Sequence, residues 1–84
     1  MNIYTVYVLY SESFNKIYIG YSSNISQRLL SHNKFATKGY TVKYRPWTLI
    51  YSEEYNTKKE AIIREKQLKT AKGRNFVWNL INEK

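Results

Sequence analysis

The sequence predicts a single α+β domain over residues 1–84, with a small three-stranded antiparallel sheet flanked by about three helices. Three observations lead to this expectation. At 84 residues and 43% hydrophobic content, the chain can build one small core and is too apolar for disorder. Strand-like and capped helical segments follow one another in the order β-β-α-β-α-α. The chain has no cysteine, which excludes disulfide frameworks and thiolate metal sites.

The first two strands are predicted to form a hairpin. Residues 3–10 are almost all β-branched or aromatic, a turn-like stretch follows, and residues 16–21 have strand character again. With a four-residue loop at 11–14, Tyr7 would lie directly opposite Tyr18, and both rings would project from one face. A slip of one residue would place the two rings on opposite faces.

A helix is predicted to follow the hairpin. Asn24 is a good N-cap, and Gln27 stands three residues later, as in a capping box. At about 100° per residue, Arg28 and His32 lie on the same edge of the helix's apolar stripe. A basic, glycine-containing stretch over residues 34–45 is then expected to be a loop.

The rest of the chain is predicted to add one strand and two helices. Residues 47–52 have strand character. A capping box at residues 57–60 predicts a helix over residues 58–71, and a short last helix is expected over residues 75–81.

Composition indicates a polyanionic partner. The net charge is +8, from 14 Lys and Arg against 6 acidic residues, and aromatic residues make up 17% of the chain. Small basic domains rich in aromatic rings are typical of nucleic-acid-binding proteins, whereas surplus lysine for solubility is the ordinary alternative. The side chains expected to contact nucleic acid are Lys38, Lys43, Arg45, Lys58, Lys66, Lys69, Lys72 and Arg74.

Membrane insertion and secretion are not expected. No apolar run approaches the roughly 20 residues of a membrane-spanning helix. The first residues lack the basic-then-apolar layout of a secretion signal. The cytoplasm is therefore the expected compartment.

Glu65 is the most informative position for function. On a helical wheel with Ala61 at zero, Leu68 lies at about 340° and Glu65 at about 40°, inside the apolar arc. A carboxylate is costly there unless it is paired or binds a metal. Taken alone, the residues leave two interpretations open, an ion pair with Arg28 or Lys69, or a metal ligand.

Each of the other candidate residues also has an ordinary structural explanation. Tyr7 and Tyr18 fit cross-strand aromatic packing, and His32 and Arg28 fit solvated positions on a helix. Gly20 fits either a bulge or a place where another group approaches the backbone closely. The absence of Asp and the single His exclude most hydrolytic triads.

Taken together, these residues resemble the GIY-YIG nuclease superfamily, and most of all its small stand-alone bacterial members. Residues 5–7, Thr-Val-Tyr, stand where the first triplet belongs, and residues 18–20, Tyr-Ile-Gly, form an intact second triplet. Eleven residues separate Tyr7 from Tyr18, and Arg28 follows ten residues later, as in the family. The same catalytic domain occurs in an excision-repair nuclease and in homing endonucleases.

Further positions extend the resemblance over nearly the whole chain. His32 matches a position that is His or Tyr in relatives, and Glu65 maps to the family's metal-binding glutamate. Residues 45–47, Arg-Pro-Trp, before a strand are also typical of the small members. The chain departs from the pattern at Thr5, which replaces the Gly of the first triplet, and at Tyr21, where many relatives have Lys.

The resemblance implies a divalent-metal-dependent endonuclease that hydrolyses phosphodiester bonds in DNA, or alternatively RNA, with structure-selective or weak specificity. It implies that Glu65 holds a single Mg²⁺ or Mn²⁺ ion, that Tyr7 and Tyr18 assist the attacking water, that Arg28 stabilises the phosphate and that His32 supports Tyr7. Because so small a chain cannot wrap a duplex, a homodimer or a larger repair or recombination partner stays open. The alternatives are a non-catalytic nucleic-acid-binding module and a protein–protein adaptor.

Overall fold

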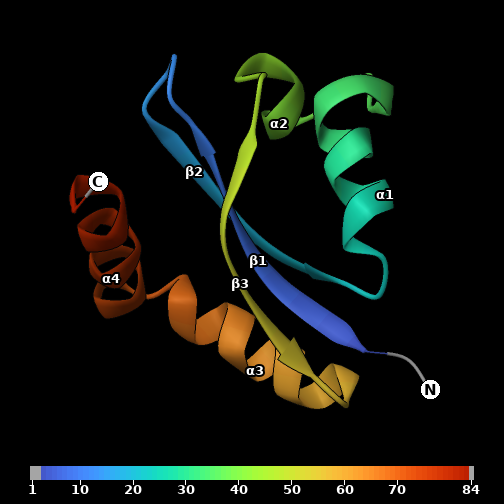
Figure 1. The fold of residues 1–84 in the computed structure, drawn as a ribbon, viewed down its shortest axis with the longest axis vertical. Coiled ribbons are helices and arrows are strands. Elements are labelled where there is room, and N and C mark those ends of the chain that lie inside the picture. Colours follow the sequence, from blue (N-terminus) through green and yellow to red (C-terminus); the bar gives the residue numbers. More distant parts are fainter. Residues whose placement is uncertain (1–2, 84) are drawn as a thin grey trace.

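A central antiparallel sheet organises the chain. The computed structural model describes residues 3–83, so residues 1, 2 and 84 of the predicted domain lie outside the described part. The elements in chain order are β1 (Tyr4–Ser11), β2 (Lys16–Ser22), α1 (Ile25–Leu30), η1 (Ser31–Phe35), α2 (Tyr40–Lys43), β3 (Thr48–Tyr55), α3 (Lys58–Leu68) and α4 (Ala71–Asn82). The strands are ordered β2-β1-β3, with β1 in the centre (Figure 1). The predicted α+β class and the three-stranded antiparallel sheet are confirmed.

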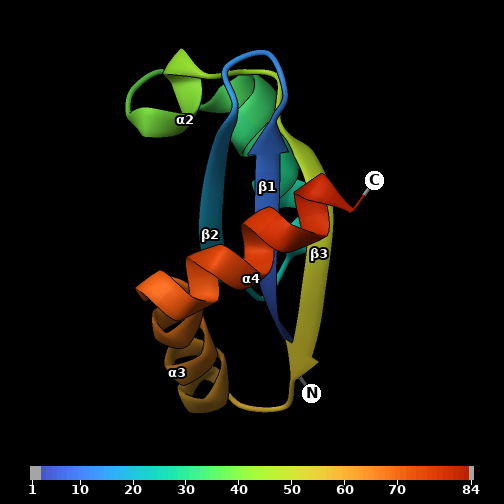
Figure 2. The ribbon, with the colours of Figure 1, turned by 90° about the vertical axis from the view of Figure 1, so that its left-hand side faces the viewer.

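Helices cover both faces of this sheet. Figure 2 shows α3 and α4 in front of the sheet and α1 behind it. Successive side chains of β1 enter the two layers in turn: Val6 and Val8 belong to the core under α3 and α4, whereas Tyr7 and Leu9 pack with Trp47 on the other side. Because β1 is covered on both faces, it has the nearly continuous apolar sequence of a buried strand. Within residues 3–83, no helix has the length and apolarity to cross a membrane.

The hairpin register differs from the prediction. The loop lies at residues 12–15, one residue later than expected, and Tyr7 is paired with Gly20 instead of Tyr18. Asn15 has a φ of 53°, in the left-handed region that Asn tolerates in turns, so it belongs to the loop and not to the strand. The change amounts to two residues of register, which preserves the side-chain face. Tyr7 and Tyr18 therefore still share a face, with ring centroids 6.3 Å apart.

The first helix begins as predicted but does not continue as a regular α-helix. Asn24 caps it, because its side chain accepts a hydrogen bond from the Gln27 backbone N–H at 3.1 Å. From Ser31 to Phe35 the chain forms a π-helical turn, which local propensity does not reveal. His32 lies in this wide turn and is buried, whereas Arg28 is exposed.

The stretch predicted as a loop over residues 34–45 contains the short helix α2. Arg45 holds this stretch against η1, since its Nε donates to the His32 carbonyl and its Nη2 to the Ala36 carbonyl, both at 2.6 Å. On the other side, Trp47 Nε1 donates to the Thr41 carbonyl at 2.8 Å. The segment is therefore ordered by tertiary hydrogen bonds and not by its own sequence preference.

The predicted boundaries of the last strand and helices need correction. Strand β3 begins one residue later than predicted and extends to Tyr55, while α3 starts as predicted but ends at Leu68. Thr70 caps α4 by accepting a hydrogen bond from the Gly73 N–H at 3.2 Å, so α4 begins four residues before the predicted residue 75. A Cβ at Gly73 would lie 2.3 Å from the Gln67 carbonyl oxygen. The glycine therefore permits close packing of two helices and is not a terminator.

Candidate active site

Four of the five predicted catalytic residues line one open pocket of about 440 Å³, at the β2 side of the sheet. They come from four elements: Tyr7 from β1, Tyr18 from β2, Arg28 from α1 and Glu65 from α3. Lys58, at the first position of α3, lines the same pocket. Residues that lie far apart in the sequence are thus brought together around a space that is open to solvent.

Gly20 makes room for the phenol of Tyr7. The two residues are direct cross-strand partners. A Cβ built on Gly20 would lie 2.7 Å from the Tyr7 hydroxyl oxygen, well inside contact distance. Close approach of another group, one of the two explanations for this glycine, is therefore what the structure shows, and the approaching group is the Tyr7 ring.

His32 reaches Tyr7 from the π turn. Its Nε2 lies 3.0 Å from the Tyr7 hydroxyl oxygen, and its ring centroid lies 4.8 Å from that of Tyr18. Burial lowers the pKa of His32 below its ordinary value of 6.5, and the positive charges of Arg28 and Arg45 lower it further. The imidazole is therefore neutral at neutral pH and can accept a hydrogen bond from the phenol.

The same surroundings keep Tyr7 protonated. Burial and the neighbouring Tyr18 raise the pKa of Tyr7 to about 12, the charge of Arg28 opposes this rise and Glu65 adds to it. The residue is only 1% exposed. At neutral pH the Tyr7 side chain is a neutral phenol.

Glu65 fits both interpretations that its position on the helix left open. Its side chain is 16% exposed, and Oε1 lies 3.5 Å from Lys69 Nζ one helical turn later. The expected ion pair with Lys69 is therefore present, while the carboxylate also lines the pocket. A partner on a flexible, half-exposed lysine leaves carboxylate lone pairs available to a ligand.

These residues fit a weakly held divalent ion but not a protein-built metal cage. Among residues 3–83, no group of three His, Asp or Glu side chains is arranged to hold a metal. Glu65 supplies a single hard oxygen ligand beside an open space, and Mg²⁺ and Mn²⁺ accept water and substrate oxygens in the remaining positions. Glu65 is therefore the residue that would hold such an ion.

The predicted nucleic-acid contacts occupy different surroundings. Lys58 lines the pocket, and Lys69 and Arg74 line a neighbouring hollow. The Nε and Nη2 of Arg45 donate hydrogen bonds to backbone carbonyls, which is a structural role. Its contact with nucleic acid stays a prediction. The remaining four are exposed on the surface: Lys38, Lys43, Lys66 and Lys72.

A second charged cluster was not predicted. The Glu53 carboxylate accepts hydrogen bonds from the hydroxyls of Tyr51 and Tyr55 and from Arg64 of α3. Tyr51, Glu53 and Tyr55 occupy every second position of β3 and therefore share one face of the strand. A strand predicted to extend to residue 55 would have placed them together. The cluster joins β3 to α3.

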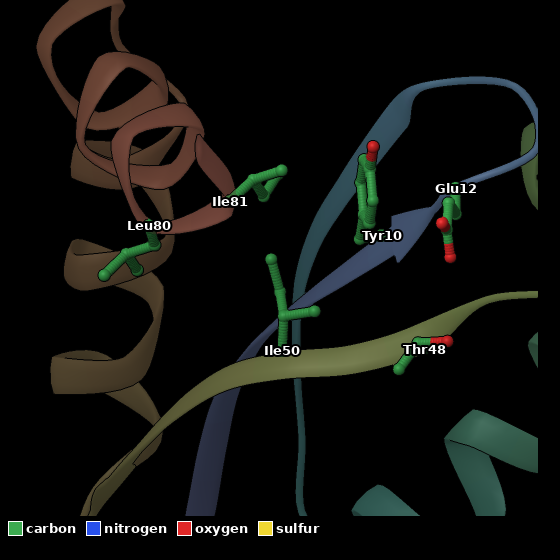
Figure 3. Close-up of a pocket in the computed structure, with 6 residues that line it drawn as sticks. All are labelled: Tyr10, Glu12, Thr48, Ile50, Leu80 and Ile81. Atoms are coloured by element: carbon green, nitrogen blue, oxygen red, sulfur yellow. The ribbon is translucent and has the colours of Figure 1, made fainter. Parts of the chain in front are cut away.

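A further hollow of about 370 Å³ lies away from these residues, where the hairpin end, β3 and the end of α4 meet. Figure 3 shows Ile50 of β3 and Ile81 of α4 extending into the same space, with Tyr10 and Glu12 at its far side. None of the predicted catalytic residues lines this hollow.

Comparison with known proteins places the chain in a family. A family model described as the GIY-YIG catalytic domain matches residues 3–80. A UPF0213 protein of Staphylococcus haemolyticus is 39% identical over 56 residues, which cover 67% of this chain and 68% of the relative. A UPF0213 protein of Staphylococcus aureus (strain Mu50) is 37% identical over 70 residues, 83% of this chain and 84% of the relative.

A solved structure has the same fold. The solution NMR structure of the UPF0213 protein BH0048 from Bacillus halodurans matches with a TM-score of 0.55 and 22% identity, covering 93% of this chain and 84% of that one. The match to the domain model assigns the chain to a nuclease superfamily, and the solved structure agrees with it in fold. The chain belongs to the GIY-YIG family, among relatives that are UPF0213 proteins, and the resemblance in its sequence is thereby confirmed.

Proposed function

We propose that this protein is an endonuclease that uses one divalent metal ion to hydrolyse phosphodiester bonds in DNA. The observation that supports this most is the shared pocket. A phenol, a guanidinium and a carboxylate line one open space of about 440 Å³ although they come from separate strands and helices. Hydrolysis of a phosphodiester needs a proton acceptor for water, relief of phosphate charge and help for the leaving oxygen, and these three groups match those needs.

Cationic groups at the exposed side of the pocket stabilise the negative charge of the phosphate. Arg28 presents a planar fork that can bind two phosphate oxygens, and Lys58 adds a second positive charge. A divalent ion bound at Glu65 would supply Lewis-acid stabilisation of the phosphate and of the leaving oxygen. The basic residues around the pocket bind the nucleic-acid backbone without reading its bases, which gives weak sequence specificity.

The proton from the attacking water moves through the buried side of the pocket. A phenol with a pKa of about 12 is a poor base if it must first ionise. With His32 in its Nδ1–H tautomer, Tyr7 donates to His32 Nε2 across 3.0 Å. Tyr7 can then take a proton from water while it passes its own proton to His32, so no free phenolate forms. Tyr18, packed against both rings, holds their relative orientation.

The decisive experiment compares two glutamates of α3. The wild-type protein, Glu65→Gln and Glu60→Gln are incubated with supercoiled, branched and single-stranded DNA in Mg²⁺ or Mn²⁺. Loss of a secondary partner of a metal already costs about 10- to 100-fold, so Glu65→Gln is expected to reduce cleavage by at least that factor. Glu60, whose carboxylate accepts a hydrogen bond from the Thr57 hydroxyl at the helix start, is the matched control and is expected to retain activity. Cleavage that survives unchanged in Glu65→Gln would refute the proposal.

A non-catalytic nucleic-acid-binding module is the second candidate. Two observations favour it: Tyr7 is almost fully buried, and Glu65 already has a cationic partner in Lys69. This candidate predicts DNA binding that falls with salt, without cleavage in any combination of substrate and metal. The cleavage assay above separates the two candidates directly.

A further inference from the structure

The neighbouring hollow that Lys69 and Arg74 line has a volume of about 270 Å³. It adjoins the candidate active site along the outer edge of β2. Tyr18 lines both hollows. Among the described strands, β2 has a neighbour on one side only, so its outer edge has no partner strand. Figure 2 shows α2 and the α3–α4 junction on the β2 side of the sheet, and side chains from these two places, Tyr40 and the pair Lys69 and Arg74, complete the hollow.

Tyr40 provides a supported aromatic surface at this hollow. Its ring stacks on Tyr18 with centroids 6.3 Å apart and planes at 29°, and it leans against Tyr44 and Trp47 with centroids 4.9 and 5.9 Å away. Its hydroxyl lies 3.5 Å from the Ile17 carbonyl oxygen. Although these contacts hold the ring, Tyr40 remains 45% exposed. A large aromatic side chain that is fixed and half-exposed is suited to stacking with a planar ligand.

Positive charge stands across from this ring. Lys69 lines the hollow and reaches Glu65 of the candidate active site, with Nζ 3.5 Å from Oε1. Arg74 lines the hollow too, and its Nε donates to the Lys69 carbonyl at 3.2 Å. The pKa of Tyr40 is raised by burial and by Tyr44, and the charge of Arg74 opposes this rise. The hollow therefore combines an aromatic face with two cations.

We propose that this hollow is a subsite for an unpaired nucleotide next to the phosphodiester that is cleaved. The inference rests on the proposed function, since Tyr18 and Lys69 join the hollow to that site. The base stacks on Tyr40, and Lys69 and Arg74 bind the adjoining phosphate. Aromatic platforms beside cationic grooves are the usual means of binding single strands. A base inside a duplex is covered on both faces by its neighbours, so this subsite selects single strands, flaps and frayed ends over continuous duplex.

A stacking probe tests the subsite without cleavage. An oligonucleotide that carries 2-aminopurine, whose fluorescence falls on stacking, is titrated in EDTA with the wild-type protein, Tyr40→Ala, Tyr40→Trp and Phe35→Ala. Tyr40→Ala is expected to lose the quenching and to weaken binding by on the order of 5- to 100-fold. Tyr40→Trp is expected to retain both. Phe35, an aromatic residue of η1 that is 66% exposed and outside the hollow, is the matched control and is expected to have no effect.

Two measurements keep the result interpretable. Thermal unfolding shows whether Tyr40→Ala is folded, and amide NMR shifts of the wild-type protein on addition of the same oligonucleotide are expected at Ile17, Tyr40 and Arg74 whether or not the variant folds. Unchanged quenching and affinity in folded Tyr40→Ala, or no shifts at these three residues, overturn the subsite even if Glu65-dependent cleavage is found. Stacking that depends on Tyr40 without metal-dependent cleavage supports binding of an unpaired base in this hollow and overturns the endonuclease instead.

Discussion

The Tyr7 hydroxyl occupies the space that a side chain at residue 20 would take. The Tyr-Ile-Gly triplet therefore has a geometric reason for its glycine: the ring of the opposite strand crosses over its backbone. This position fixes where the phenol meets His32 Nε2. A proton relay tolerates little displacement, because a misplacement of about 1 Å can cost roughly 100-fold in rate.

Gly20→Ala tests this packing at the scale of one residue. The added methyl would lie 2.7 Å from the Tyr7 hydroxyl oxygen, so the Tyr7 ring must shift and its 3.0 Å contact with His32 Nε2 is disturbed. We expect a loss of about 1–3 kcal/mol in the free energy of unfolding, as for other overpacked cores, and a fall of about 100-fold in cleavage. Urea unfolding and the nicking assay measure the two effects. A variant with normal stability and full activity would contradict the claim that Gly20 sets the position of the Tyr7 phenol.

Single residues also show what the sequence can reveal about the site. Tyr18, Arg28 and Glu65 reach the pocket because local periodicity sets the side of the strand or helix that each occupies. His32 was expected on the edge of a regular helix, but it contacts Tyr7 from a π turn that no propensity reports. Its partnership with Tyr7 was therefore predictable only through family resemblance.

At the scale of elements, the starts of α1 and α3 follow from the sequence, whereas the start of α4 does not. The helix caps Asn24 and Thr57 act through hydrogen bonds within three residues, so sequence spacing reveals them. The split between α3 and α4 depends instead on tertiary packing, because Gly73 lies against the last turn of α3. The predicted hairpin loop lies one residue too early because its position depends on the left-handed backbone conformation of Asn15.

The Glu53–Arg64 pair gives an element-scale prediction for the contact between β3 and α3. Arg64 Nε lies 2.9 Å from Glu53 Oε1. Burial of this carboxylate raises its pKa, but hydrogen bonds from Arg64, Tyr51 and Tyr55 outweigh burial and bring the pKa below 4.5. Because the folded-state pKa is depressed, the pair stabilises the fold above the unfolded-state pKa, and this stabilisation is lost as pH falls through the folded-state value.

Glu53→Gln is therefore expected to lower the free energy of unfolding by about 1–3 kcal/mol at neutral pH, and by progressively less as the solution is acidified. Urea unfolding from neutral pH to about pH 3 measures both trends. Glu54→Gln removes the same charge from the exposed neighbouring residue and is the control, with an expected change within about 0.5 kcal/mol. Equal destabilisation by both variants at every pH would contradict a specific role for the Glu53 cluster.

Over the whole molecule, the charge of +8 would make the proposed binding of nucleic acid sensitive to salt. We expect the logarithm of the binding constant to fall linearly with the logarithm of salt concentration between about 50 and 200 mM, with a slope near 0.9 per phosphate neutralised on duplex DNA. Lys58→Gln, in the pocket, is expected to reduce that slope by about one. Lys59→Gln, on the exposed neighbouring residue, is expected to leave it unchanged. Equal effects of both variants would mean that the positive charge acts diffusely and not at the pocket.

The burial of Tyr7 affects which residues of this fold would be retained in evolution if catalytic activity were lost. The ring is one of the largest fully buried side chains and packs with Leu9 and Trp47, so the domain needs it for stability whether or not it performs chemistry. A descendant that had lost hydrolysis would still be selected to keep this tyrosine, while its exposed arginine at position 28 would be free to drift. The identity of residue 28, more than that of Tyr7, would therefore distinguish descendants that retain catalytic activity from those that have lost it.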